Sequence, residues 1–116
     1  MSTFKTKNGL VASAIGQTPV TVSASDVNLS AGMYFAKTMS GAITFTFSNP
    51  PPSGHAQSFL LEVTGDGNGI TWPASVIWEN GITPTDPPSS AVDVFVFLTV
   101  DSGTTYIGKK IIEGAA

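Results

Sequence analysis

The residues that could do chemistry in this sequence are few and lie far apart. His55 is the only histidine, and it follows the proline-rich stretch of residues 49–54. A Ser/His/Asp triad needs a nucleophile, a base and an orienting group within hydrogen-bond reach, and it often presents its serine on a Gly-x-Ser-x-Gly turn. The sequence contains no such turn. We therefore expect His55 to lie on a surface loop, and we expect no catalytic residue.

Acidic residues suggest two further kinds of site, a calcium loop and a carboxylate pair. The run from Asp66 to Gly69 resembles the start of a calcium loop, but the later acidic ligand of such loops is missing, which favours a glycine-rich hairpin. Asp93 and Asp101 share one face of an expected strand. At the strand rise they are about 26 Å apart, too far to act as a paired acid and base. We expect no metal and no cofactor.

Two tryptophans form the aromatic feature most open to a binding role. Trp72 and Trp78 are six residues apart around Pro73. Exposed aromatic faces bind the apolar patches of sugars, but tryptophan also anchors the cores and subunit interfaces of small β-domains. Trp72 and Trp78 are therefore a candidate pair for either ligand binding or packing, and packing is the favoured interpretation.

Hydrophobic alternation with a period of two predicts the elements that must position these residues. Residues 19–23, 42–48 and 57–64 alternate in this way, and turns rich in Gly, Pro, Ser and Asn separate them. No segment keeps a helical period. The chain of 116 residues fits one domain. We predict an all-β fold, specifically an antiparallel β-sandwich of jelly-roll type, spanning residues 1–116 as a single domain.

The expected strand at residues 92–101 is apolar on both faces. Valines and Leu98 occupy one face, and Phe95 and Phe97 occupy the other. Residues 104–112 are expected to pair with it as a hairpin. A sandwich buries only one face of each sheet, so the second face needs a cover. With Leu60, which sits on the polar side of the strand at 57–64, Phe95 and Phe97 form the candidate subunit interface.

Composition narrows the classes of function. Charged residues make up 11% of the chain, against about 25% in ordinary domains, which favours a surface covered by partners. There is no arginine and the net charge is −3, so nucleic-acid binding is not expected. The sequence shows neither a basic-then-apolar leader nor an apolar run long enough for a membrane span. Residues 1–8, with Lys5 and Lys7, are expected to form an N-terminal arm.

Four motifs carry a resemblance to a known group of proteins. They are residues 28–35, 44–51, 70–78 and 92–108, and the stretch that they span, residues 28–108, is about two thirds of the chain. This pattern resembles a module of tailed-bacteriophage virion proteins, especially tail-fibre and other appendage proteins. The resemblance implies a β-sandwich virion part, commonly a homotrimer, with no enzymatic role and no assigned site. Residues 79–88 are more proline-rich than the corresponding family segment.

Two virion roles and one role of another class follow as expectations. A short chain of low charge favours a capsid decoration, or cement, protein that forms a homotrimer and stabilises the particle. The alternative is a tail-fibre or appendage component for host attachment. A carbohydrate-binding module, with a surface glycan as ligand, is the competitor from another class. The expected partners are copies of itself and other virion proteins such as capsid or tail proteins, with no nucleic acid and no membrane. The expected location is the virion, after synthesis in the host cytoplasm.

Overall fold

The regular secondary structure of residues 16–116 consists of β-strands and one short 3-10 turn. The computed structural model describes residues 16–116, so the arm expected over residues 1–8 lies outside the described part. In that part the structure confirms the all-β prediction. The elements in order are β1 (Val20–Thr21), β2 (Asp26–Asn28), β3 (Tyr34–Thr38), β4 (Ile43–Thr44), β5 (Thr46–Ser48), β6 (Gln57–Thr64), β7 (Ile70–Thr71), β8 (Val76–Trp78), the 3-10 turn η1 (Glu79–Gly81), β9 (Val92–Thr99) and β10 (Tyr106–Ala115).

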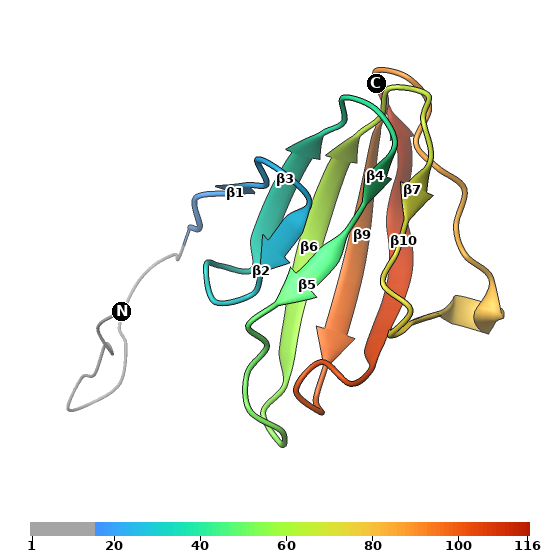
Figure 1. Ribbon diagram of the computed structural model, residues 1–116. Helices are drawn as coiled ribbons and strands as arrows, with labels where there is room; N and C mark the ends of the chain where they lie inside the picture. The colour runs from blue at the N-terminus through green and yellow to red at the C-terminus, as the bar shows by residue number, and fades with distance from the viewer. Residues whose placement is uncertain (1–15) are drawn as a thin grey trace.

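The strands form one large sheet and two small ones. The large sheet has the order β1-β3-β6-β9-β10-β8, and the small sheets pair β2 with β5 and β4 with β7. In Figure 1 the small sheets lie over one face of the large sheet. The expectation of antiparallel pairing is wrong for most pairs. Only the two pairings of β9, with β6 and with β10, are antiparallel, and the other five are parallel.

The parallel pairs arise because the chain passes repeatedly between the large sheet and the small sheets. β1, β3 and β6 stack in parallel in the large sheet, and the strands between them belong to the small sheets. The glycine-rich segment at residues 65–69 is part of this path. It leads from β6 in the large sheet to β7, which pairs with β4, so the expected glycine-rich hairpin is wrong. The hairpin predicted between β9 and β10 is confirmed.

The core lies between the large sheet and the small ones. The alternation at residues 57–64 is confirmed, because Phe59, Leu61 and Val63 are buried. From the small-sheet side, Phe47 meets Phe59 and Phe97 edge-to-face, with ring centroids 5.2 and 5.1 Å apart. Such aromatic pairs contribute free energy beyond the area they bury. The aromatic rings therefore hold the small sheets onto the large one.

Gly108 lets two large rings lie directly against β10. A Cβ atom at this position would stand 2.8 Å from the Phe97 ring and 3.0 Å from the Trp78 ring. Gly108 faces the core between its partners Phe97 on β9 and Trp78 on β8. The absence of a side chain there makes room for both rings, so the sequence needs glycine at this position of the strand.

We predict a large difference between two neighbouring truncations on β9. Phe97→Ala removes a ring that is 0% exposed, and it is expected to lower the free energy of unfolding by about 3–5 kcal/mol. Leu98→Ala, on the opposite face, is the control and is expected to cost less than about 1 kcal/mol. Urea unfolding below the concentration of self-association measures both. Equal losses would contradict the assignment of the two faces.

Candidate interaction surface

The outer face of the large sheet, away from the small sheets, carries the largest group of exposed apolar side chains. We call it the outer apolar face. The most exposed members are Ile77 (56%), Ile107 (53%), Val100 (53%) and Leu98 (40%). Half-buried members lie beside them, and the full set is Leu60, Ile77, Val96, Leu98, Val100 and Ile107. Exposed apolar groups gathered on one face make that face a candidate interaction site.

Strand register brings these residues together from distant parts of the sequence. Ile107 on β10 is opposite Ile77 on β8 and Leu98 on β9. One row further along, Val96 on β9 is opposite Leu60 on β6. Directly paired side chains on one face of a sheet have Cβ atoms about 5 Å apart. The outer apolar face is therefore continuous across four strands.

Polar groups border the outer apolar face without interrupting it. Lys109 flanks Val96 on β10 and forms an exposed ion pair with Glu79, with 3.4 Å between Nζ and Oε1. On the other side the Tyr34 hydroxyl donates a hydrogen bond to Glu62. This bond, with burial and the carboxylate charge, raises the pKa of Tyr34. An apolar centre with a polar border is the usual anatomy of a protein–protein interface.

The candidate subunit interface of Leu60, Phe95 and Phe97 is corrected by the strand register. Phe59 pairs with Phe97 and Leu61 with Phe95, whereas Leu60 pairs with Val96. Leu60 and the two phenylalanines therefore point to opposite faces of the large sheet. Phe95 and Phe97 are 1% and 0% exposed within one copy of the chain, so they offer no surface to another copy. Only Leu60 lies on the outer apolar face.

The tryptophan pair belongs to the core cluster. Trp78 is 8% exposed. The Trp72 ring is half-buried, stacks on Phe45 at 5.2 Å and meets Trp78 edge-to-face at the same distance. Both rings also contact Phe97. Trp78 is closed to solvent and Phe45 covers one face of Trp72, so the structure favours packing over an exposed stacking platform for a sugar.

The residues considered for chemistry do not converge. His55 is exposed on the loop before β6, where its main-chain N–H donates to Pro52. The Asp66 carboxylate accepts hydrogen bonds from the main-chain N–H groups of Gly41 and Asn68, which lower its pKa. Within residues 16–116, no three His, Cys, Asp or Glu side chains gather as metal ligands would. The same residues contain no helix with the length and hydropathy of a membrane span.

One buried ion pair stands at the end of the core near the chain terminus. Asp93 is 0% exposed, and its Oδ2 atom lies 2.9 Å from Nζ of Lys110, while its Oδ1 atom accepts a hydrogen bond from the main chain at Gly114. Lys110 also donates to the Thr85 main-chain oxygen at 2.7 Å and to Glu113 at 3.1 Å. Burial works to lower the pKa of Lys110, but its partners Asp93 and Glu113 outweigh burial and raise it.

Comparisons with known proteins add no assignment. No family model matches the sequence, and the searches of curated proteins and of solved structures found no match.

Replacing one member of the buried pair is expected to lower the free energy of unfolding more than replacing both members. Asp93→Asn leaves the Lys110 charge uncompensated and should lower the free energy of unfolding by about 3–5 kcal/mol. The double variant Asp93→Leu/Lys110→Met removes both charges and is expected to keep most of the stability. Urea unfolding at neutral pH measures both variants. A double variant as unstable as Asp93→Asn would contradict the pairing.

Asp101 makes the hairpin that carries Val100 sensitive to acid. Its carboxylate accepts hydrogen bonds from the main-chain N–H of Thr105 at 2.9 Å and from the Thr99 hydroxyl at 3.1 Å. The bond from Thr105 is the main cause that lowers the pKa of Asp101 below 3.8. Because the folded-state pKa is below the unfolded one, the stabilisation is complete above 3.8 and is lost as pH falls through the folded value.

Asp101→Asn is therefore expected to lower the Tm at about pH 7. The difference in Tm between this variant and the native chain should be smaller at about pH 2.5. Thermal unfolding followed by circular dichroism at the two pH values measures this. The control is Ser53→Asn on an exposed loop, which should behave like the native chain at both. A difference that does not change with pH would overturn the role of the carboxylate.

Proposed function

We propose that this protein is a non-enzymatic structural protein of a bacteriophage virion that assembles with copies of itself, as a homotrimer acting as a capsid decoration protein. The observation that carries the proposal is the outer apolar face. Four of its side chains are at least 40% exposed in a single copy. Covering them by a second copy removes apolar area from water, which is the main favourable term in protein association.

The other side of the molecule supports the choice of this face. Over the small sheets, the outward side chains of β4, β5 and β7 include the exposed threonines Thr44, Thr46 and Thr71. Exposed threonine hydroxyl groups form hydrogen bonds with water, so this face needs no partner to cover it. The chain therefore presents one face suited to water and one suited to contact, which fits a protein that sits on or between other subunits.

The fold and the four motifs support a virion part. We propose that the domain is a β-sandwich whose second layer consists of the two small sheets. The motif at residues 70–78 supplies the tryptophans of the core, and the motif at residues 92–108 supplies β9 and the start of β10. The residues that resemble phage modules thus supply part of the core and, apart from Leu60 on β6, the outer apolar face. A tail-fibre component is the alternative within the same class, and it would use the same face.

A carbohydrate-binding role has weaker support. It would need an accessible aromatic face, and the faces of Trp72 and Trp78 pack against other rings of the core. We therefore propose partners that are proteins: copies of this chain, and capsid or tail proteins of the particle.

A charge placed on the outer apolar face is expected to abolish self-association. Size-exclusion chromatography with light scattering should give a trimer for the native 12.0 kDa chain at micromolar concentration and a monomer for Leu98→Lys. The matched control is Thr44→Lys, at an exposed position over the small sheets, which should remain a trimer. Equal masses for the two variants would contradict a role for this face.

The number of copies of this protein in each particle distinguishes a capsid decoration protein from a tail-fibre component. In purified particles of a phage that encodes the chain, a decoration protein is expected in about the copy number of the major capsid protein. A tail-fibre component is expected in only a few copies. Quantitative mass spectrometry of the particles distinguishes the two, and the absence of the protein from particles would overturn the virion proposal.

A further inference from the structure

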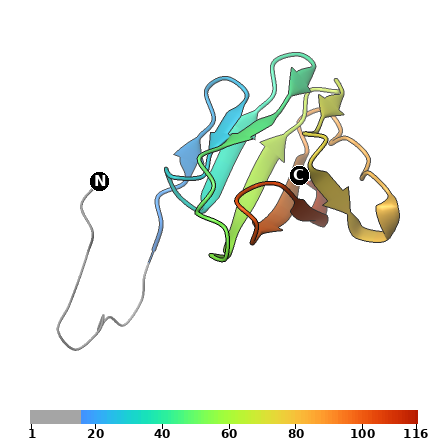
Figure 2. The ribbon, with the colours of Figure 1, turned by 60° about the horizontal axis from the view of Figure 1, so that its bottom comes forward.

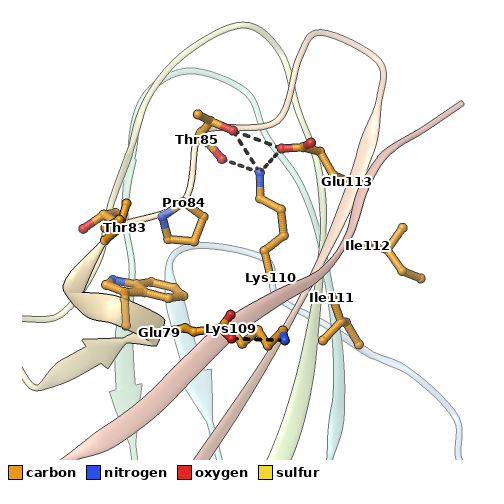
Figure 3. Close-up of a pocket in the computed structure, with 11 residues that line it drawn as sticks. Glu79, Thr83, Pro84, Thr85, Lys109, Lys110, Ile111, Ile112 and Glu113 are labelled. Atoms are coloured by element: carbon orange, nitrogen blue, oxygen red, sulfur yellow. Dashed lines mark hydrogen bonds and ion pairs between the residues drawn. The ribbon is translucent and has the colours of Figure 1, made fainter.

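A groove runs along the β10 edge of the large sheet, beside the loop of residues 79–91. Its volume is about 440 Å³, and its walls are the segment from Trp78 to Thr85 and the second half of β10. Figure 2 shows this loop standing out beyond the sheet. In Figure 3 the Lys110 side chain reaches toward the loop, while Ile111 and Ile112 point away from it. The Lys109 and Lys110 side chains reach from β10 to Glu79 and Thr85 on the opposite wall.

Within residues 16–116, no strand lies beside the second half of β10 on this side. β8 pairs only with residues 106–108 of β10 and ends at Trp78. The Tyr106 N–H donates to Ser75 on the β8 side, and alternate residues of a strand direct their main-chain groups to the same side. The N–H and C=O of Lys110 therefore point past the end of β8. Among residues 16–116, no main-chain hydrogen bond joins the loop to this part of β10.

An unpaired strand edge beside an apolar groove is suited to the addition of one more strand. The added segment supplies main-chain hydrogen bonds, and pockets along the groove receive alternate side chains. The groove offers Trp78, Ile82 and Pro84 as apolar contacts, and Ile82 is 70% exposed. The register of β10 against β9 shifts after Lys110, so the regular part of the free edge is short and fits a short strand.

We propose that this groove receives residues 10–15 of a second copy of the chain, which add to the free edge of β10 as a strand. The inference rests on the proposed self-assembly and names the segment that links one copy to the next. Residues 10–15 read Leu-Val-Ala-Ser-Ala-Ile. They carry no charge and no proline. Five of the six side chains are apolar, so alternate side chains of an added strand could contact the apolar residues of the groove.

The distribution of net charge favours contact between residues 1–15 and the body of another copy. Residues 1–15 contain Lys5 and Lys7 and no acidic residue, so they contribute +2 to the net charge of −3, and the rest of the chain contributes −5. Glu79 and Glu113, which are 56% and 69% exposed in their side chains, stand at the groove. Lys109 pairs with Glu79 and Lys110 pairs with Glu113, so the charges at the groove itself are balanced. A basic segment is therefore attracted to the acidic body of the protein as a whole.

The topology favours the groove of a neighbour over the groove of the same copy. β1, the first strand that follows residues 1–15 in the sequence, is the edge strand of the large sheet opposite β8. β10 is four strand spacings, about 19 Å, from β1. A segment of the same copy would have to cross a face of the sheet to reach the free side of β10. Exchange between copies is a head-to-tail contact, which closes into a ring when the rotation between copies allows it. A trimer is such a ring.

Cross-linking tests the proposal directly, because the chain contains no cysteine. Full-length Ala12→Cys chains are mixed with tagged Ile111→Cys chains at micromolar concentration and treated with a short bis-maleimide. The matched control replaces Ile111→Cys with Thr44→Cys, which is exposed over the small sheets. We expect at least about tenfold more cross-linked pairs with Ile111→Cys than with Thr44→Cys.

Two outcomes would overturn the proposal. One is an equal yield for the two positions. The other is observed with a chain that carries both Ala12→Cys and Ile111→Cys. If this chain forms cross-links only within one copy, the groove receives residues 10–15 of the same copy. Light scattering on the same samples distinguishes the proposed strand exchange from the proposed function. A trimer that lacks this cross-link would contradict the strand exchange alone. A monomer would contradict both the strand exchange and the proposed self-assembly.

Discussion

The antiparallel pairing of β6 with β9 is the interaction on which the rest of the structure depends. It places Phe59 opposite Phe97 and Leu61 opposite Phe95 on the core face, and Leu60 opposite Val96 on the outer face. A slip of one residue in this pairing would move every side chain of one strand to the other face. The rings on the core face then hold the small sheets, and the side chains between them form the outer apolar face.

The small sheets cover only one side of the large sheet, and this asymmetry connects the fold to association. Their aromatic residues, such as Phe45 and Phe47, pack onto the core face. No described part of the chain covers Leu98, Ile107 and Ile77 on the other face. A strand such as β9, apolar on both faces, is stable in water only at the cost of exposed apolar area. The proposed assembly with other copies would remove that exposed area from water.

The buried pair of Asp93 and Lys110 shapes the groove beside β10. Lys110 links β10 to Thr85 on the loop through its ammonium, so the loop is held beside the strand by a side chain and the main chain of the strand remains free. Gly65 holds the far end of the same loop through main-chain hydrogen bonds with Ser90 and Ala91. The loop is thus fixed at two points, which keeps the groove between them.

The sequence by itself determined where the long strands lie. The strand expected at residues 57–64 is found there, and the one expected at residues 92–101 is found at residues 92–99. Residues 42–48 alternate as strictly, but the expected single strand is wrong, because the segment is divided between β4 and β5 in two different small sheets. The sequence did not determine which face of the strand at residues 92–99 is buried, since valines and phenylalanines satisfy either face. Short strands such as β2 and β7, and the parallel pairing of most strands, also left no pattern, because contacts between distant residues create them. The tertiary structure decided these points: the register of β6 with β9 placed Phe95 and Phe97 inside and made Leu60, Leu98 and Ile107 the candidate surface.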